Sequence, residues 1–463
     1  LMAQDRDGVL LNKMNTTVDG DFQRYAVESG AYIREHFFGP DPRLRKMVEG
    51  LSDDELRTLP RGGHDYRKLY AAYKAATEME GAPTVILAKT IKGWTLGPDA
   101  EGRNATHQIK KMTKEQLVTM RDRLYLHEEI PDEALEGGIP PYYRPAEDSE
   151  IYQYMVQRRR ELDGPLPSRP APLRRKLKLP TDKPFEELKS GSGKQEVATT
   201  MAFTRLLRTL LREEEFGARI VPIIPDEART FGMDSLFREI GIYASSGQLY
   251  DPVDSDLLLS YHEKKDGQLL EEGITEAGAM ASFTAAGTSY ATRGVPMVPF
   301  YIYYSMFGFQ RIGDLVWSFA DQRGRGFLLG ATAGRTTLVG EGLQHADGHS
   351  HVLFSVVPNC LSYDPAFAYE IGAVIKDGIR RMYGPEPEDI FYYLTLYNET
   401  YQMPALPDGV TEADVVSGLY RFAPGKNGAS RRATILVSGT AHTAAREAQA
   451  LLAEHHDVAA DLW

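Results

Sequence analysis

The feature that most constrains how this chain folds is a regular alternation of strand-like and helix-like segments over residues 191–415. Buried-strand patterns occur in "RIVPIIPDEA", "PMVPFYIYY", "GRGFLLGAT" and "DIFYYLTLYN". Helical patterns separate them, as in "GITEAGAMASFTAAGTSYATRG" and "AFAYEIGAVIKDGIRRMYG". Such alternation favours an α/β fold in which helices cover both faces of a mostly parallel sheet. Ligands of such sheets bind beyond the carboxyl ends of the strands, so candidate functional residues are sought there.

Three further segments carry secondary-structure signals. "YRKLYAAYKAATEM", residues 66–79, spaces its apolar side chains three and four apart and predicts a helix. "APTVILAKTIKG", residues 82–93, is rich in β-branched side chains and predicts a buried strand. "QEVATTMAFTRLLRTLLREEE" predicts an amphipathic helix. The side chains expected on or near its buried face are Val197, Met201, Leu207 and Leu211.

Composition indicates how these segments are divided among domains. Residues 131–190 hold 10 of the chain's 27 prolines, which predicts an interdomain linker. From about residue 416 onward, "RRATILVSGT", "AHTAAREAQALLAEHH" and "DVAADLW" indicate a strand, a helix and a strand. A unit of this kind needs more sheet than this stretch supplies. We therefore expect a piece of a larger polypeptide, with structured segments at 1–130, 191–415 and 416–463.

Charge and cysteine content exclude several classes of protein. A net charge of -12 argues against general nucleic-acid binding, which needs a basic face to neutralise phosphates. Cys360 is the single cysteine, so a disulfide framework and a thiolate metal cluster are excluded. That cysteine content fits a reducing compartment, and we expect a cytoplasmic protein. No stretch approaches the roughly 18–20 apolar residues that span a bilayer, so no membrane partner is expected.

Four polar or aromatic clusters follow strand-like segments. They are "DEARTFGM", which begins at Asp226, then Glu276, then an aromatic set, and finally "GLQHADGHSH". The aromatic set comprises Tyr303, Tyr304, Phe307 and Phe309. Each cluster also has a structural interpretation, because acidic residues after strands cap helices and aromatic side chains fill cores. Their shared position at one end of one sheet nevertheless favours a functional site.

The histidine-rich segment is open to a metal-binding interpretation. His345, His349 and His351 are spaced by four and two residues. A pair at i and i+4 suits a zinc-binding helix, but the neighbouring glycines indicate a loop. Ala346 also stands where a zincin motif requires glutamate. A zinc site and a catalytic histidine are both kept as hypotheses at this point.

Several longer motifs are similar to those of a known protein family. The motifs are "DEARTFGM", "EGITEAGA", "PFYIYYSMFGFQRIGDL", "GRTTLVGEGLQHADGHSH", "NCLSYDPAFAYE", "RGGHD" and "ILAKTIKG". Together they resemble the homodimeric bacterial pyruvate dehydrogenase E1 component. This family uses thiamin diphosphate and belongs to the 2-oxo acid dehydrogenase complex. The resemblance covers essentially the whole chain, as an incomplete stretch of such a protein. It implies a transketolase-like fold, with residues 1–130 ending a pyrophosphate-binding domain, 191–415 forming a pyrimidine-binding domain, and 416–463 beginning a C-terminal domain.

The resemblance also implies roles for particular residues near the cofactor. Glu276 resembles the glutamate that hydrogen-bonds the aminopyrimidine ring of thiamin diphosphate and takes part in its proton exchange. Phe307 corresponds to the aromatic residue that stacks on that ring. Tyr304 is similar to a tyrosine beside the substrate pocket. Asp226 and Glu227 fall where the family has acidic residues near the cofactor.

Two histidines receive roles in the same way. His345 resembles an active-site histidine that bonds the substrate carboxylate or the intermediate derived from it, a task suited to imidazole near neutral pH. His64, in "RGGHD", resembles a histidine on a mobile loop that helps pass the acyl group to the lipoyl arm. His349 and His351 are expected to support the loop that carries His345.

The implied reaction is decarboxylation of pyruvate followed by reductive acetylation of the lipoyl group on a dihydrolipoyl acyltransferase (E2). The expected assembly is a homodimer bound to that partner. Family members bind the diphosphate through Mg²⁺ with a "GDG" motif, which this sequence lacks, so the Mg²⁺ ligands are expected upstream of it. Rival hypotheses are a transketolase-like enzyme of sugar phosphates, a zinc hydrolase, and a non-catalytic scaffold subunit.

Overall fold

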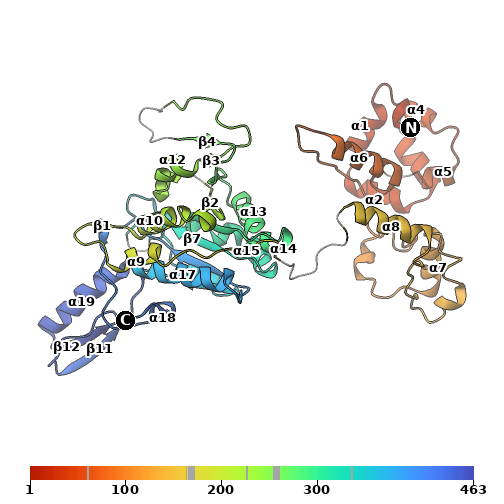
Figure 1. Ribbon diagram of the computed structural model, residues 1–463. Coiled ribbons are helices and arrows are strands. Elements are labelled where there is room, and N and C mark those ends of the chain that lie inside the picture. Colours follow the sequence, from red (N-terminus) through yellow and green to blue (C-terminus); the bar gives the residue numbers. More distant parts are fainter. Residues whose placement is uncertain (60–61, 163, 165–172, 226–227, 254–260, 335–336) are drawn as a thin grey trace. The chain divides into compact units, whose positions relative to one another are not determined.

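The chain forms two compact units in a computed structural model that describes residues 1–59, 62–162, 164, 173–225, 228–253, 261–334 and 337–463 (Figure 1). The first unit is Leu1–Pro165 and the second is Leu166–Trp463. No helix in these ranges has the length and apolar character needed to cross a membrane.

The first unit is helical in the part that is described. Several of its helices begin at polar caps, such as α5, where the side chains of Ser52 and Glu55 bond each other's backbone amides. A small apolar core lies under the first helices and contains Val9, Leu10, Ile33, Phe37, Phe38, Leu44, Val48 and Leu56. The helices are α1 Val9–Thr16, α2 Asp19–Val27, α3 Gly30–Ile33, α4 Pro42–Met47, α5 Asp53–Arg57, α6 Tyr66–Glu78, α7 Lys114–Arg123 and α8 Glu150–Glu161.

The two sequence predictions for residues 66–93 have different outcomes. The helix is confirmed as α6, which Asp65 caps by accepting hydrogen bonds from the amides of Arg67 and Lys68. The buried strand at residues 82–93 is wrong, because this segment is irregular and Val85 and Leu87 are 81% and 92% exposed. A strand needs a neighbour for its backbone groups, and the described residues of this unit contain no other strand.

The described part of the interval 131–190 contains the α-helices α8 and α9 (Lys183–Lys189). The boundary between the two units falls inside this interval. On its C-terminal side, Phe185 of α9 is 3% exposed and belongs to the core of the second unit. The domain limits given above stay predictions.

The second unit is built on a six-stranded sheet in the order β5-β2-β6-β7-β9-β8. Every neighbouring pair in this sheet is parallel. The strands are β2 Ile220–Ile224, β5 Leu270–Glu271, β6 Val298–Tyr304, β7 Phe327–Ala331, β8 Cys360–Tyr363 and β9 Phe391–Thr395. The strand predictions in "RIVPIIPDEA", "PMVPFYIYY", "GRGFLLGAT" and "DIFYYLTLYN" are thereby confirmed.

The helices of this unit and its smaller two-stranded sheets complete the fold. The helices not yet given are α10 Thr199–Leu211, α11 Glu214–Gly217, α12 Phe237–Ile240, α13 Glu276–Gly287, α14 Ser289–Thr292, α15 Phe309–Asp321, α16 Ser350–Phe354, α17 Ala368–Tyr383, α18 Glu412–Val416 and α19 His442–His455. The smaller sheets pair β1 Glu196–Val197 with β10 Tyr401–Gln402, β3 Ile242–Tyr243 with β4 Glu263–Lys264, and β11 Arg431–Ile435 with β12 Val458–Leu462.

Alternating side chains of the central strands enter two separate cores. On β6, Phe300 and Ile302 join a core that includes residues of α10 and α17. Tyr301 and Tyr303 point to the opposite face and join a core with residues of α13 and α15. This alternation follows from the two-residue repeat of a strand. The predicted α/β fold, with helices on both faces of a parallel sheet, is confirmed (Figure 1).

The amphipathic helix after residue 195 is confirmed as α10, but its predicted buried face is partly wrong. Val197 is buried in the core, but it lies before the helix and pairs with Tyr401 in a small antiparallel sheet. Leu211 is partly buried against the same core. Met201 is 40% exposed, whereas Leu207 is fully buried as expected. The side chains that face the core at helical spacing are Ala202, Phe203, Leu206, Leu207 and Leu210.

The strand, helix and strand predicted near the C-terminal end of the sequence are confirmed as β11, α19 and β12. The two strands are parallel, with Arg431 paired to Val458 and Ile435 paired to Leu462.

Candidate functional site

The chain makes a tight turn at the carboxyl end of β6. Tyr304 ends the strand, Phe307 lies in the 3₁₀ turn Ser305–Phe307, and α15 begins two residues later. Gly308 permits this turn, since an added Cβ would stand 2.1 Å from the ring of Tyr303. The turn therefore brings Tyr304 and Phe307 to the sheet edge where ligands of parallel sheets bind.

His345 meets both aromatic residues of this turn. Its ring lies edge-on to Tyr304, with centroids 4.9 Å apart, and edge-on to Phe307, at 5.1 Å. Phe231 packs behind Tyr304 at 5.1 Å. Three of the site residues predicted from the sequence are thus brought together from segments about 40 residues apart.

The two ring nitrogens of His345 differ in their contacts. Its side chain is 11% exposed, and Nε2 lies 3.4 Å from Oε2 of Glu341. Nδ1 is buried without a hydrogen-bond partner among the residues that the structure describes. A buried polar atom without a partner is costly, so this nitrogen is suited to bonding a ligand.

Glu276 is the first residue of α13, and Thr275 caps that helix by accepting from the amide of Gly278. The Glu276 side chain is 11% exposed, and its Oε1 lies 2.5 Å from Nη1 of Arg311. The guanidinium carbon of Arg311 also lies 4.3 Å from the centre of the Phe307 ring. Arg311 therefore links Glu276 to the cluster of Tyr304, Phe307 and His345.

Arg311 was missed by the sequence analysis. The sequence does show a basic residue four positions after Phe307, and this residue lies in the first turn of α15. The pair with Glu276 depends on how α13 and α15 pack, which that spacing does not reveal.

The remaining histidines of the segment have separate partners. His349 is hydrogen-bonded to the side-chain amide of Gln310. His351 Nε2 lies 3.0 Å from Oγ1 of Thr395. The three histidines thus do not converge on one point, and the described ranges contain no group of three or more His, Cys, Asp or Glu side chains that could hold a metal ion.

Asp347 fixes the loop between these histidines. Its carboxylate accepts hydrogen bonds from the amides of His349 and Ser350, and from Ser350 Oγ at 2.6 Å. Burial opposes ionisation of this carboxyl, but the hydrogen bonds outweigh it and hold its pKa below the usual value. Asp347 therefore anchors the first turn of α16 and the loop that carries His345.

His64 belongs to the first unit. Its Nε2 accepts a hydrogen bond of 2.7 Å from the amide of Ile91, and its ring stacks on Trp94 with centroids 4.5 Å apart. In the neutral ring, that bond leaves the proton on Nδ1. Asp226 and Glu227, the other predicted cofactor contacts, lie outside the described residues.

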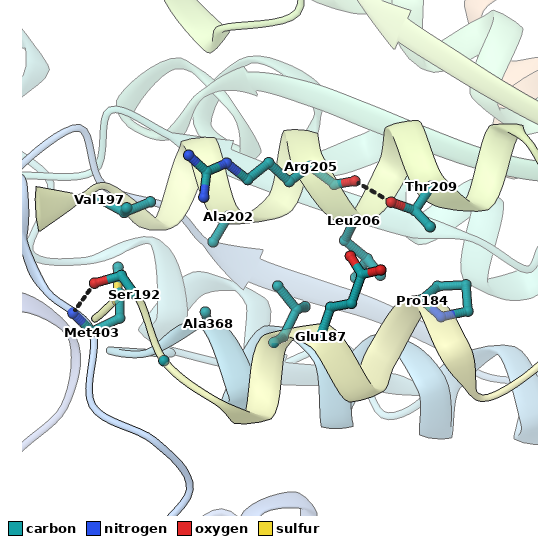
Figure 2. Close-up of a pocket in the computed structure, with 12 residues that line it drawn as sticks. Pro184, Glu187, Ser192, Val197, Ala202, Arg205, Leu206, Thr209, Ala368 and Met403 are labelled. Atoms are coloured by element: carbon teal, nitrogen blue, oxygen red, sulfur yellow. Dashed lines mark hydrogen bonds between the residues drawn. The ribbon is translucent and has the colours of Figure 1, made fainter. Parts of the chain in front are cut away.

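Two hollows occur elsewhere in the second unit. One of about 120 Å³ lies between α9 and α10, and Figure 2 shows the side chains that line it. Two hydrogen bonds join residues that line it: the amide of Met403 donates to Ser192 Oγ at 2.9 Å, and Thr209 Oγ1 donates to the carbonyl of Arg205 at 3.0 Å. A larger cleft of about 410 Å³ lies beside β8, the start of α17 and the β11–β12 sheet. Of the predicted site residues that the structure describes, none lines either hollow.

The fold defines a class of protein. Two crystal structures of a transketolase from Pichia stipitis match with TM-scores of 0.52 and 0.53 at 16% identity. Each match covers 86% of this chain and 54% of the transketolase chain. At that identity the likeness shows the fold alone, and the fold is transketolase-like.

Sequence comparison identifies the family within that class. Residues 177–404 match the middle domain of the pyruvate dehydrogenase E1 component. All of this chain aligns with the pyruvate dehydrogenase E1 component of Mycolicibacterium smegmatis at 55% identity, over 50% of that protein. The Escherichia coli K12 protein is 48% identical, with 51% of its length covered. The chain belongs to the pyruvate dehydrogenase E1 component family and spans about half the length of the curated relatives it matches.

Proposed function

We propose that Glu276, Tyr304, Phe307 and His345 form part of a thiamin-diphosphate site at which the full-length enzyme decarboxylates pyruvate. The enzyme then transfers the acetyl group to the lipoyl group of its acyltransferase partner. The observation that carries this proposal is the meeting of an imidazole and two aromatic rings at the carboxyl end of β6, linked through Arg311 to the carboxylate of Glu276. Family membership supports the choice of reaction.

The chain's residues fit the cofactor's pyrimidine ring. That ring needs a hydrogen-bonding carboxyl group and a flat apolar surface. The side chain of Glu276, 11% exposed, supplies the first, and Phe307 supplies the second. A ring stacked on Phe307 gains about 0.5–1.5 kcal/mol beyond its area burial. When bound, thiamin diphosphate supplies an electron sink for decarboxylation.

Each residue then has a distinct task. The carboxyl group of Glu276 would bond a ring nitrogen of the bound cofactor and could exchange a proton there, which an amide of the same shape could not do. His345 directs Nδ1 at the carboxylate of pyruvate, because that nitrogen has no partner among the described residues. Tyr304 and Phe307 wall this space, and their rings exclude water from it.

The proposal extends to the metal ion and to the assembly of the enzyme. We propose that Mg²⁺ accompanies the diphosphate, with ligands other than the residues assigned here, and that Asp226 and Glu227 lie near the cofactor. The enzyme acts in the cytoplasm as a homodimer with a dihydrolipoyl acyltransferase. His64 assists acetyl transfer to the lipoyl arm, and its stacking on Trp94 supports a fixed ring orientation for that task.

A substrate comparison tests the proposal. The full-length enzyme, with thiamin diphosphate and Mg²⁺, is given pyruvate, 2-oxoglutarate or a ketose phosphate. We expect CO₂ release from pyruvate alone. Activity on 2-oxoglutarate or on the ketose phosphate instead would move the enzyme to a sister family. An absence of turnover, together with one bound zinc per chain, would favour the zinc hydrolase.

A further inference from the structure

The carboxylate of Asp364 gathers hydrogen bonds from residues at or beyond the carboxyl ends of β9 and β11. Asp364 itself follows β8, and its side chain is 11% exposed. Its Oδ1 accepts from Thr395 Oγ1 and from the hydroxyl of Tyr397, each at 2.5 Å. Its Oδ2 accepts from Ser438 Oγ, also at 2.5 Å. One carboxylate thus joins three strand ends of the second unit.

The turn after β11 comes very close to this carboxylate. The amide of Gly439 donates to the backbone carbonyl of Asp364 at 3.2 Å. A Cβ added at Gly439 would lie 2.5 Å from the hydroxyl oxygen of Tyr397 and 3.0 Å from Asp364 Oδ1. The φ of Gly439 is +55°, in the left-handed region that favours glycine. Glycine at this position therefore lets the turn reach the carboxylate.

Thr395 connects the carboxylate to the histidine-rich segment. Thr395 is 1% exposed, and His351 Nε2 lies 3.0 Å from its Oγ1. A hydroxyl has one proton, and Thr395 donates that proton to Asp364, so Nε2 of His351 must be the donor in its own bond to Oγ1. The carboxylate therefore sets both the direction of the threonine hydroxyl and the ring nitrogen of His351 that carries a proton.

The segment that carries His345 is held at two points beyond that residue. Asp347 anchors it through hydrogen bonds to the first turn of α16. His351, six residues after His345, ties it to Thr395 at the end of β9. Loss of the second hold would free the C-terminal side of the segment, so the position of the His345 imidazole would be less well defined.

We propose that Asp364 is a positioning residue for the reaction. Through Thr395 and His351 it fixes the loop that carries His345, and through Ser438 it ties that loop to the turn after β11. The inference rests on the proposed function, because that function makes the placement of His345 matter. The role needs no contact between Asp364 and pyruvate or the cofactor.

The test follows pyruvate decarboxylation by the full-length enzyme with thiamin diphosphate and Mg²⁺. Thr395→Val keeps the shape of the side chain but removes the hydroxyl that joins Asp364 to His351. Because this change leaves both partners without that hydrogen bond, kcat/KM for pyruvate should fall about ten- to hundredfold. The Kd of thiamin diphosphate should not change. Thr395→Ser restores the hydroxyl and should stay near the wild type in kcat/KM.

Double variants separate positioning from a general loss of stability. In a His345→Ala background, Thr395→Val should cause little further loss, because the group that is positioned is already gone. A merely structural effect would lower kcat/KM by the same factor in both backgrounds. Asp364→Asn should show the same dependence on His345, since a neutral amide accepts weaker hydrogen bonds than a carboxylate.

Asp377→Asn is the matched control for the loss of a buried carboxylate. The Asp377 side chain is 13% exposed, and it accepts a hydrogen bond from the hydroxyl of Tyr392 at 3.1 Å. It lies on α17 and has no link to the histidine-rich segment among its printed partners Arg380, Arg381 and Tyr392. This variant should leave kcat/KM for pyruvate unchanged. Circular dichroism and thermal unfolding confirm that each variant is folded.

The outcomes are distinguishable. Folded Thr395→Val and Asp364→Asn enzymes that match the wild type in kcat/KM, or that lose equally with and without His345, overturn the positioning role and leave the proposed function intact. If one of the two variants does not fold, the other decides by the same criterion. A wild-type enzyme that does not decarboxylate pyruvate overturns the proposed function, and this inference with it.

Discussion

At the scale of the residue, His345 is distinguished from His349 and His351 by its Nδ1, which is buried and has no hydrogen-bond partner in the part of the chain that the structure describes. We predict that His345→Ala lowers the rate of pyruvate decarboxylation by about 10²–10⁴-fold, since it removes a positioned hydrogen-bonding and proton-exchanging group. His349→Ala is the matched control, because His349 is 41% exposed and bonded to Gln310. Steady-state CO₂ release measures both variants. Equal losses in the two would contradict a special role for His345.

Most of the candidate site could be predicted from the sequence, because its residues lie in long contiguous motifs after strands. Glu276 and the segments that hold Tyr304, Phe307 and His345 were found in that way, and the resemblance to the pyruvate dehydrogenase E1 family then singled out these three residues within their segments. Arg311 was not, because its partner lies 35 residues earlier on another helix. Its contact depends on the packing of α13 against α15, and the spacing of residues along one helix carries no information about that packing.

At the scale of the element, Gly378 lets α17 approach the sheet closely. A Cβ at this position would lie 2.7 Å from Cε1 of Phe327, whose side chain is fully buried. We predict that Gly378→Ala lowers the free energy of unfolding by about 1–3 kcal/mol through overpacking. For Gly372→Ala, on the same helix, the closest contact of the added Cβ would be the flexible end of Leu188 at 3.1 Å, so this variant should be neutral or gain up to about 1 kcal/mol. Urea unfolding compares them; equal effects would contradict this account.

Asp347 makes the anchoring of α16 dependent on pH. Its pKa in the folded protein lies below the ordinary value of 3.8, so its contribution to stability is complete above that value and is lost as the pH falls through the folded pKa. Asp347→Asn should destabilise the protein at neutral pH by about 1 kcal/mol, because hydrogen bonds to a charged carboxylate are stronger than those to a neutral amide. The difference from wild type should shrink below about pH 3.8. Thermal unfolding across pH measures this, with the exposed Asp408→Asn as control. A difference that grows at low pH would contradict the prediction.

Strands were predicted correctly where a buried segment also has a neighbouring strand to pair with. They were predicted wrongly where the tertiary structure gives the segment no such neighbour among the described residues. Four strands of the central sheet, β2, β6, β7 and β9, pair with neighbouring strands of that sheet and were found, whereas β5 and β8 were not predicted. The segment 82–93 has equally strong β-branched character, yet it makes only isolated bonds, such as that between the amide of Gly63 and the carbonyl of Lys89 at 3.1 Å. Strand propensity reflects packing against neighbours, so it fails where the described residues offer none.

At the scale of the whole molecule, the two units have separate apolar cores. The second unit contains both cores that flank the six-stranded sheet. We predict that residues 173–463 fold without the first unit, because the sheet and the helices on both its faces lie within that range. Circular dichroism and a cooperative thermal transition of this fragment check the prediction. A fragment that unfolds without a cooperative transition would show that the second unit depends on the first.

The central claim is that Glu276 is the carboxyl group that serves the cofactor. The most direct measurement is the initial rate of CO₂ release from pyruvate by the full-length wild type, Glu276→Gln and Glu272→Gln, each saturated with thiamin diphosphate and Mg²⁺. Glu272 is the matched control, because it lies four residues earlier and its carboxylate accepts a hydrogen bond from Ser282 Oγ at 2.5 Å. We predict a loss of about 10²–10⁴-fold for Glu276→Gln and a rate near that of wild type for Glu272→Gln. A Glu276→Gln enzyme as fast as wild type would contradict the account.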